Sequence, residues 1–351
     1  MKRVIAIAMQ KGGVGKTTTA VNLAASLAAT KRRVLLIDMD PQGNTTMGSG
    51  IDKSQLKCST CEVLLGECQL ADAFVPIEHG AGFTLLPANQ DLTAAEVRLL
   101  TLPIGRETKL RQALAPKRND FDLVLIDCPP ALNMLTVNAL VAADSVLIPM
   151  QCEYYALEGL SALLSTVEQI RAAVNPQLAI EGVLRTMFDP RNNLANEVSA
   201  QLVAHFGDKV FRTVIPRNIR LAEAPSFGKP ALFHDKESRG ALAYLALAGE
   251  MIRREEESTG AVRNLTAMTS ATAASPVTAP TAPTASAANA TAANTTNTAN
   301  TTNAANAGNA VDTNGVDTAT TAGPATNPAS GSAMSAPVSA APAPQAEERS
   351  R

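Results

Sequence analysis

The residues with the strongest chemical signature form a glycine-rich run near the N-terminus, from Lys11 to Thr18. Glycines let backbone N–H groups converge on a phosphate, and a helix that begins there adds a partial positive charge. In such a loop Lys16 reaches the β- and γ-phosphate oxygens, and the Thr17 hydroxyl is placed to ligate Mg²⁺. The run therefore predicts a nucleotide-phosphate site built from Gly12, Gly13, Val14, Gly15, Lys16, Thr17 and Thr18.

Two apolar runs farther along the chain end in carboxylates that could serve the same site. Leu35–Ile37 is followed by Asp38 and Asp40, and Leu123–Ile126 is followed by Asp127. A carboxylate near a γ-phosphate can orient the attacking water, and another can hold Mg²⁺ through a water. Any buried parallel strand can end in an aspartate, so Asp127 alone does not indicate a metal ligand. It does so only in combination with the glycine-rich run.

The elements around these residues form a strand–loop–helix–strand unit. Val4–Met9 is a continuous apolar run, which is typical of a strand buried on both faces of a parallel sheet. Apolar residues then recur at helical spacing from Lys16 to Ala29, and Arg33–Ile37 forms the next apolar run. The glycine-rich run thus lies between a buried strand and a helix, the context that a phosphate-binding loop requires.

The same alternation continues along the chain and predicts an α/β fold. We expect one P-loop NTPase domain, with a mostly parallel twisted sheet and helices on both faces. Ser238 is a suitable N-cap for the last helix. Further strands are predicted at Phe83–Leu86, Leu123–Ile126, Ser145–Pro149, Ile180–Thr186 and Val210–Ile215, and helices at Leu157–Ala173, Leu194–Phe206 and Ser238–Glu257.

Composition divides the 351 residues into two parts. Residues 258–351 consist mostly of Ala, Thr, Asn, Pro, Ser and Gly, with few large apolar side chains to offset the entropy of ordering, so we expect a disordered tail. Residues 1–257 form the predicted ATPase domain and carry 27 basic and 28 acidic side chains. This near-neutral balance excludes a protein that binds polyanions through net charge, although a local basic face remains possible.

The five cysteines and the N-terminus bear on the compartment. Their number is odd, and no secretory signal precedes the first strand, so we expect a reducing, cytoplasmic compartment and a fold that needs no disulfide. Cys58 and Cys61 have the spacing of a metal or redox pair, but no second pair or histidine lies at a zinc-finger distance. Cys128 and Cys152 adjoin apolar strand segments and are predicted to be buried. No apolar stretch is long enough to span a membrane.

The glycine-rich run resembles that of the deviant Walker A ATPases. The general P-loop pattern has glycine at position 10, where this chain has Gln10, and an additional lysine follows as Lys11. In the resembled family this signature lysine reaches the phosphates bound by the partner subunit. The resemblance therefore implies ATP and Mg²⁺ as ligands, a homodimer that forms in the ATP state, and Lys11 as both a binding and a catalytic residue.

Four further stretches resemble the chromosomal ParA/Soj partition ATPases within that family. The similarity covers about residues 1–255, and it implies an ATP-bound dimer that binds double-stranded DNA without sequence specificity. It also implies hydrolysis stimulated by a ParB/Spo0J-type partner, action at the nucleoid, and no membrane association. The stretches are Asp40–Asn44, Ile126–Pro130, Gln151–Leu160 and Val214–Ser226.

The resemblance assigns roles to particular residues. Asp40 is expected to position or activate the attacking water and, with Lys11 and Lys16, to be catalytic, while Asp38 is the weaker candidate. Asp127 is expected to hold Mg²⁺ through a water, together with Thr17. Pro216 and Asn218 match residues that line the adenine pocket in the family.

DNA contact is expected from a basic segment near the end of the domain. Residues 209–239 contain seven basic and three acidic side chains, enough for salt-sensitive phosphate binding. Arg191 and Arg220 match positions that the family uses for DNA. The alternative is that such arginines cap helices or pair with Glu223 and Asp235.

Two functions from other classes stay open. The family also includes membrane-surface positioning ATPases of the MinD type, but their membrane-targeting helix follows the last domain helix, where this chain carries a polar tail. It further includes the nitrogenase iron protein, a redox protein whose dimer shares an iron–sulfur cluster. Lipid binding and visible absorption, respectively, would distinguish these functions from DNA partitioning.

Overall fold

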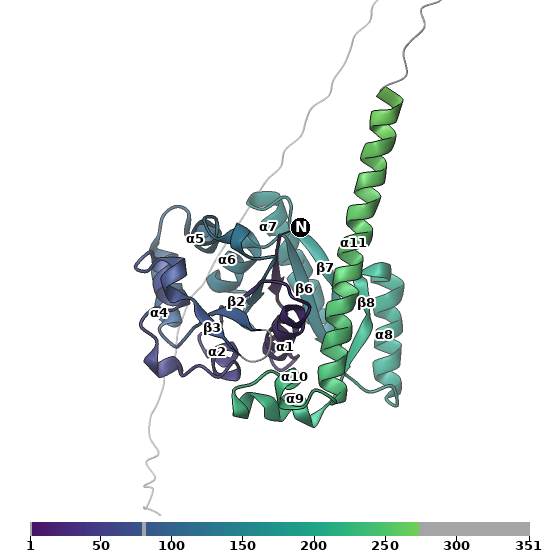
Figure 1. Ribbon diagram of the computed structural model, residues 1–351, viewed down its shortest axis with the longest axis horizontal. Helices are drawn as coiled ribbons and strands as arrows, with labels where there is room; N and C mark the ends of the chain where they lie inside the picture. The colour runs from purple at the N-terminus through teal and green to yellow at the C-terminus, as the bar shows by residue number, and fades with distance from the viewer. Residues whose placement is uncertain (1, 79–81, 274–351) are drawn as a thin grey trace, which may run out of the picture. The chain divides into compact units, whose positions relative to one another are not determined.

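A single eight-stranded sheet forms the centre of the protein in the computed structural model, which describes residues 2–78 and 82–273 (Figure 1). The strand order is β3-β4-β2-β5-β1-β6-β7-β8, and every neighbouring pair is parallel except β3 with β4. The strands are β1 (Arg3–Ile7), β2 (Val34–Asp38), β3 (Val75–Ile77), β4 (Phe83–Leu86), β5 (Leu123–Asp127), β6 (Ser145–Gln151), β7 (Ala179–Phe188) and β8 (Val210–Pro216).

Helices connect the parallel strands and cover both faces of the sheet. A connection between parallel strands must cross over the sheet, and a helix does so while burying its apolar stripe. They are α1 (Lys16–Ala29), α2 (Asn44–Gly48), α3 (Thr60–Leu65), α4 (Leu92–Thr101), α5 (Lys109–Leu114), α6 (Met134–Ala142), α7 (Ala156–Ala173), α8 (Asn193–Phe206), α9 (Ile219–Glu223), α10 (Ala231–His234) and α11 (Arg239–Ala273).

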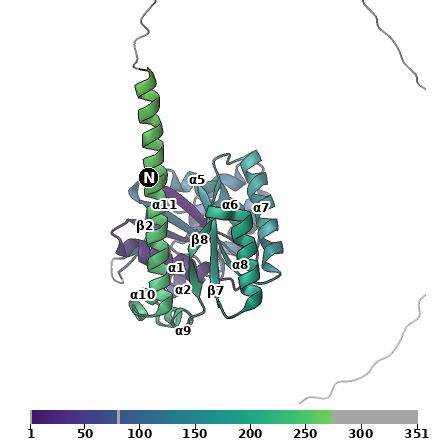
Figure 2. The ribbon, with the colours of Figure 1, turned by 90° about the vertical axis from the view of Figure 1, so that its right-hand side faces the viewer.

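The central strands alternate their side chains between two hydrophobic cores. In β1, Val4 and Ala6 pack into the core beneath α3–α8, whereas Ile5 and Ile7 pack into the core beneath α1 and α11. Figure 2 shows strands β7 and β8 between α11 on one side and α8 on the other. Because both of their faces are buried, the central strands β1, β2 and β5 are almost continuously apolar, which is why the sequence pattern identified them.

Hydrogen bonds attach α11 to α1 and β8. The Tyr244 hydroxyl lies 3.1 Å from Thr19 Oγ1 of α1, and both residues are buried. Glu250 accepts hydrogen bonds from the backbone N–H groups of Arg212 and Thr213 in β8. Since buried polar groups are costly without partners, these contacts fix how α11 lies against α1 and β8.

The fold class predicted from the sequence is confirmed, with differences at some ends of elements. Ser238 caps α11 as expected, because its Oγ accepts a hydrogen bond from the N–H of Ala241. Strand β3 was not predicted: it has only three residues, one of them Pro76, and lies antiparallel at the sheet edge. The predicted tail at 258–351 lies outside the described residues from 274 onward.

The last helix is longer than the composition predicted. Disorder was expected from Ser258, but α11 continues to Ala273. Residues 258–273 contain one glycine and no proline, and the first proline after the domain is Pro276. Nothing in this stretch blocks the helical backbone, so α11 extends beyond the point at which its apolar pattern ends.

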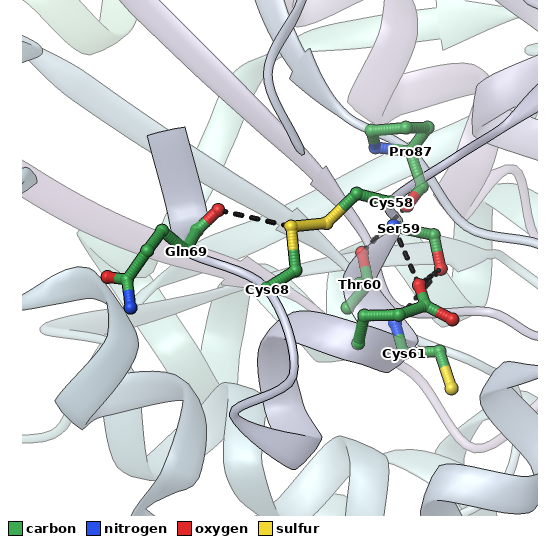
Figure 3. Close-up of a disulfide and its surroundings, with 8 residues drawn as sticks. Cys58, Ser59, Thr60, Cys61, Cys68, Gln69 and Pro87 are labelled. Atoms are coloured by element: carbon green, nitrogen blue, oxygen red, sulfur yellow. Dashed lines mark hydrogen bonds between the residues drawn. A yellow bond between two sulfur atoms is a disulfide. The ribbon is translucent and has the colours of Figure 1, made fainter. Parts of the chain in front are cut away.

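A disulfide joins Cys58 and Cys68, although the sequence indicated a reducing compartment and a fold that needs no disulfide (Figure 3). The two residues flank α3, which begins after the Ser59 cap and ends at Gly66, so the chain returns and brings their Cα atoms to 6.4 Å. Cys61, which was considered as a partner of Cys58, is a buried free thiol inside α3. Cys128 and Cys152 are buried free thiols, as predicted.

Candidate nucleotide site

The glycine-rich loop occupies the centre of the sheet, between β1 and the start of α1. Gly13 and Gly15 have φ angles of 73° and 87°, a left-handed conformation that strains any residue with a side chain. Gly15 is the N-cap of α1, and no side chain caps that end of the helix. The free N–H groups at the helix start and its partial positive charge thus face the loop, as phosphate binding requires.

Two hydrogen bonds hold the loop in place. The Thr186 hydroxyl of β7 donates to the Val14 carbonyl oxygen at 2.8 Å, and the Lys16 ammonium donates to the Lys11 carbonyl oxygen at 3.1 Å. Lys16 is buried, which lowers its pKa, while the nearby Asp127 raises it. The ammonium is therefore poorly solvated, and a bound anion would compensate for the lost solvation.

Asp127 lies directly beside the loop at the end of β5. It is the register partner of Ile7 in β1 and is fully buried. Its Oδ2 accepts hydrogen bonds from the hydroxyls of Thr17 at 2.8 Å and Thr45 at 2.7 Å. Its Oδ1 is buried with no hydrogen-bond partner among the described residues. Burial raises the pKa of Asp127 to about 6, against the effect of the two threonine hydroxyls.

Asp38 and Asp40 differ in what surrounds their carboxylates. Asp38 is fully buried and accepts hydrogen bonds from the N–H and hydroxyl of Thr46 and from the N–H of Asp40. Burial and the neighbouring Asp127 raise its pKa to about 8. Asp40 is 8% exposed, and its Oδ1 accepts a hydrogen bond from the N–H of Gln42 at 2.9 Å. Asp38 thus organises the loop after β2, whereas Asp40 retains contact with solvent.

Lys11 forms an ion pair within its own chain. Its ammonium lies 2.7 Å from Glu153 Oε2, and 31% and 45% of the two side chains are exposed. Glu153 follows β6, the strand next to β1, by two residues. The segment after β6 therefore contacts the glycine-rich loop through this ion pair.

The residues predicted for adenine lie farther along the sheet. Pro216 ends β8, which is the edge strand and three strands away from β1. The Asn218 side chain caps α9 by accepting a hydrogen bond from the N–H of Arg220 at 3.0 Å. The segment returns to the loop's helix at Ala231, whose N–H donates to Asn22 Oδ1 in α1 at 2.7 Å. The segment that follows Pro216 therefore contacts α1, the helix that begins at the phosphate loop.

Both arginines predicted for DNA are paired with carboxylates of their own chain. Arg191 is 87% exposed and forms two hydrogen bonds with Asp189 at 2.9 and 2.8 Å. Arg220 contacts Glu223 at 2.8 Å and Asp235 at 3.2 Å. Arg220 therefore pairs with Glu223 and Asp235, as the alternative interpretation predicted. Both arginines nevertheless remain accessible at the surface.

The sequence pattern missed three residues of this site: Thr45, Thr186 and Glu153. Thr45 and Thr186 act through single hydroxyls on Asp127 and on Val14. No local pattern marks such a contact, because its partner lies on another element. Glu153 lies in one of the stretches used for the family resemblance, but nothing in its spacing indicates that it pairs with Lys11.

Comparisons with known proteins identify similar sequences. A model of an AAA domain family matches residues 2–180. The chain is 52% identical over 257 residues to "Chromosome partitioning protein ParA" of Caulobacter vibrioides, which covers 73% of this chain and 96% of that protein. It is 53% identical over 256 residues to "Chromosome-partitioning ATPase Soj" of Thermus thermophilus, with 73% and 98% covered.

Solved structures share the fold. A Mycobacterium smegmatis protein described as cobyrinic acid a,c-diamide synthase, with bound ADP and magnesium, is 40% identical with a TM-score of 0.64, over 74% of this chain and 97% of the other. The Pyrococcus furiosus cell division ATPase MinD is 25% identical with a TM-score of 0.61, over 72% and 99%. Within the described residues, no helix has the length and apolar character needed to cross a membrane.

Proposed function

This chain belongs to the ParA/Soj family of chromosome-partitioning ATPases, and from that premise we propose that it segregates DNA by an ATP-controlled dimer. In the ATP state the dimer binds double-stranded DNA without sequence specificity, and a ParB/Spo0J-type partner stimulates hydrolysis to ADP and phosphate. The observation that carries this proposal is the convergence of the loop at 11–18, Asp40, Asp127 and Thr17 at the carboxyl ends of β1, β2 and β5.

The site suits the phosphates of ATP together with Mg²⁺. The loop N–H groups and Lys16 would bind the phosphate oxygens, and the adenine would lie near Pro216 and Asn218. Asp127 offers a buried oxygen that no described residue hydrogen-bonds, and this oxygen lies beside the Thr17 hydroxyl. Such hard oxygen donors are the ligands that Mg²⁺ prefers. Thr17 and Asp127, the latter through a water, would hold the ion, which when bound neutralises charge on the phosphate oxygens.

Asp40 is the proposed catalytic carboxylate. Its solvent contact allows it to orient a water near the γ-phosphate, while Lys16 stabilises the charge of the transition state. Lys11 would add a second ammonium from the partner subunit. Asp38 supports the loop rather than the reaction, because donors of its own chain occupy both of its oxygens.

The proposed DNA surface includes Arg191 and Arg220. With this surface the protein would act at the nucleoid rather than at a membrane. Both side chains are exposed, and their carboxylate partners are surface groups that DNA phosphates can displace. Contacts to phosphates alone give binding without base readout and with strong salt dependence. This behaviour fits a protein that moves over DNA of any sequence.

Retention on random-sequence duplex DNA across a salt series tests the proposal. The samples are the full chain with ATP and Mg²⁺, with ADP, and with Lys16→Ala. We expect tight, salt-sensitive retention with ATP alone, lost in Lys16→Ala. Vesicles of anionic phospholipid form a parallel arm. Binding to vesicles but not to DNA would replace the partitioning role with a MinD-like one, and absence of DNA binding in every nucleotide state would reject it.

A further inference from the structure

The ion pair between Lys11 and Glu153 bears on when the lysine can act. Its Nζ–Oε2 distance is 2.7 Å, shorter than is typical of a solvent-separated pair. The backbone fixes Glu153, since its N–H donates to the Gln151 carbonyl and its own carbonyl accepts from the Ala156 N–H. A hydrogen-bonded turn between β6 and α7 therefore presents the carboxylate to the lysine.

We propose that Glu153 is a positioning residue that holds Lys11 on its own subunit until the ATP-bound dimer forms. The inference rests on the proposed function, in which Lys11 contacts the phosphates of the partner subunit. A carboxylate held beside the triphosphate would repel it, so we expect the ammonium to leave Glu153 when it binds those phosphates. Dimer formation must therefore exchange one carboxylate partner for the partner subunit's phosphates.

The surroundings allow this exchange. Both side chains are partly exposed, so a second subunit can reach the Lys11–Glu153 pair without unfolding any element. Glu153 is followed by Tyr154 and Tyr155, which are 72% and 73% exposed and pack edge to face at 5.5 Å. A triphosphate carries more negative charge than one carboxylate, so it competes successfully for the lysine once it is brought close.

The strength of the pair sets the size of the effect. A partly exposed ion pair such as Lys11–Glu153 contributes only a modest stabilising free energy. A symmetric dimer contains two such pairs, and both must break when it forms. Glu153 therefore tunes dimerisation instead of blocking it. We expect that removing its charge lowers the dissociation constant of the ATP-state dimer by about fivefold.

Sedimentation of the full chain with a non-hydrolysable ATP analogue and Mg²⁺ measures that constant. The variants are Glu153→Gln, Lys11→Ala and the double variant, with Glu158→Gln as the matched control because Glu158 is an exposed glutamate of the same segment. Glu153→Gln is expected to dimerise more tightly, Glu158→Gln to match the wild type, and the gain to vanish in the Lys11→Ala background. Weaker dimerisation of Glu153→Gln, or a gain that persists without Lys11, would overturn the proposal.

A second measurement tests the pair in the nucleotide-free monomer. Acylation by a water-soluble amine reagent is followed by mass spectrometry, with the exposed Lys236 as internal reference. Glu153→Gln should accelerate modification of Lys11 at least twofold relative to Lys236, and an unchanged rate would refute the Lys11–Glu153 pair. If the wild type never dimerises with nucleotide, the proposed function fails at that step, and acylation alone decides the role of Glu153.

Discussion

Asp38 and Asp127 are register partners on the adjacent parallel strands β2 and β5, and both are fully buried. Asp127 raises the cost of ionising Asp38, in addition to the cost of burial. Hydroxyls compensate in part: Thr46 donates to Asp38, and Thr17 and Thr45 donate to Asp127. The floor of the nucleotide site is thus a pair of carboxyls whose protonation is coupled to folding.

The raised pKa of Asp38 predicts how stability depends on pH. Its carboxyl keeps a proton in the folded state up to about pH 8 but ionises near 3.8 when unfolded, so the folded state loses stability as pH rises through that window. In chelator-treated protein, Asp38→Asn should gain stability relative to wild type by up to about 1.4 kcal/mol per pH unit between those limits. Urea unfolding at several pH values measures the difference. The exposed Asp72→Asn serves as control, and a pH-independent difference for Asp38→Asn would contradict the assignment.

Substitution of Asp40 should separate binding from hydrolysis. Asp40→Asn is expected to bind ATP within about twofold of wild type while ATP turnover falls about 100-fold, because only the orientation of water is lost. Lys16→Ala, by contrast, should lose both. Equilibrium binding of a fluorescent ATP analogue and phosphate release measure the two quantities. Equal losses of binding and turnover in Asp40→Asn would assign that carboxylate to nucleotide binding.

Arg191 and Arg220 should contribute to DNA binding through phosphate contacts. Each alanine variant is expected to weaken DNA binding severalfold and to lower the slope of log affinity against log salt by about 1. Arg171→Ala is the matched control, since Arg171 is likewise an exposed arginine paired with a nearby carboxylate of its own chain, Glu168. Fluorescence anisotropy across a salt series measures the slope. If Arg171→Ala behaves like the other two, the effect is one of net charge only.

The disulfide predicts a count of thiols and a loss of stability on reduction. Of the five cysteines, Cys61, Cys128 and Cys152 are free, so unfolded but unreduced protein should titrate as three thiols. Cys58 and Cys68 are separated by 10 positions, and reduction should cost on the order of 2–3 kcal/mol in the free energy of unfolding. Thiol titration and urea unfolding with and without reductant measure both. Five reactive thiols in unreduced protein would show that the bond does not form.

Local patterns in the sequence predicted the fold class, most of the central strands and the phosphate loop. A strand buried on both faces must be continuously apolar, and a loop that turns at Gly13 and Gly15 needs residues that tolerate a positive φ. Both requirements act over a few neighbouring residues, so they can be read directly from the chain. The edge strand β3 was missed because three residues containing a proline leave no such pattern.

Only the tertiary structure determined which distant residues meet. Lys11 pairs with Glu153 and Thr17 with Asp127 across more than one hundred positions, and Cys58 joins Cys68 because α3 turns the chain back between them. Such contacts depend on strand order and register, which the hydrophobic pattern of any single strand does not encode. The residues proposed for the chemistry were therefore visible in the sequence, whereas the partners that hold them became visible only in the assembled sheet.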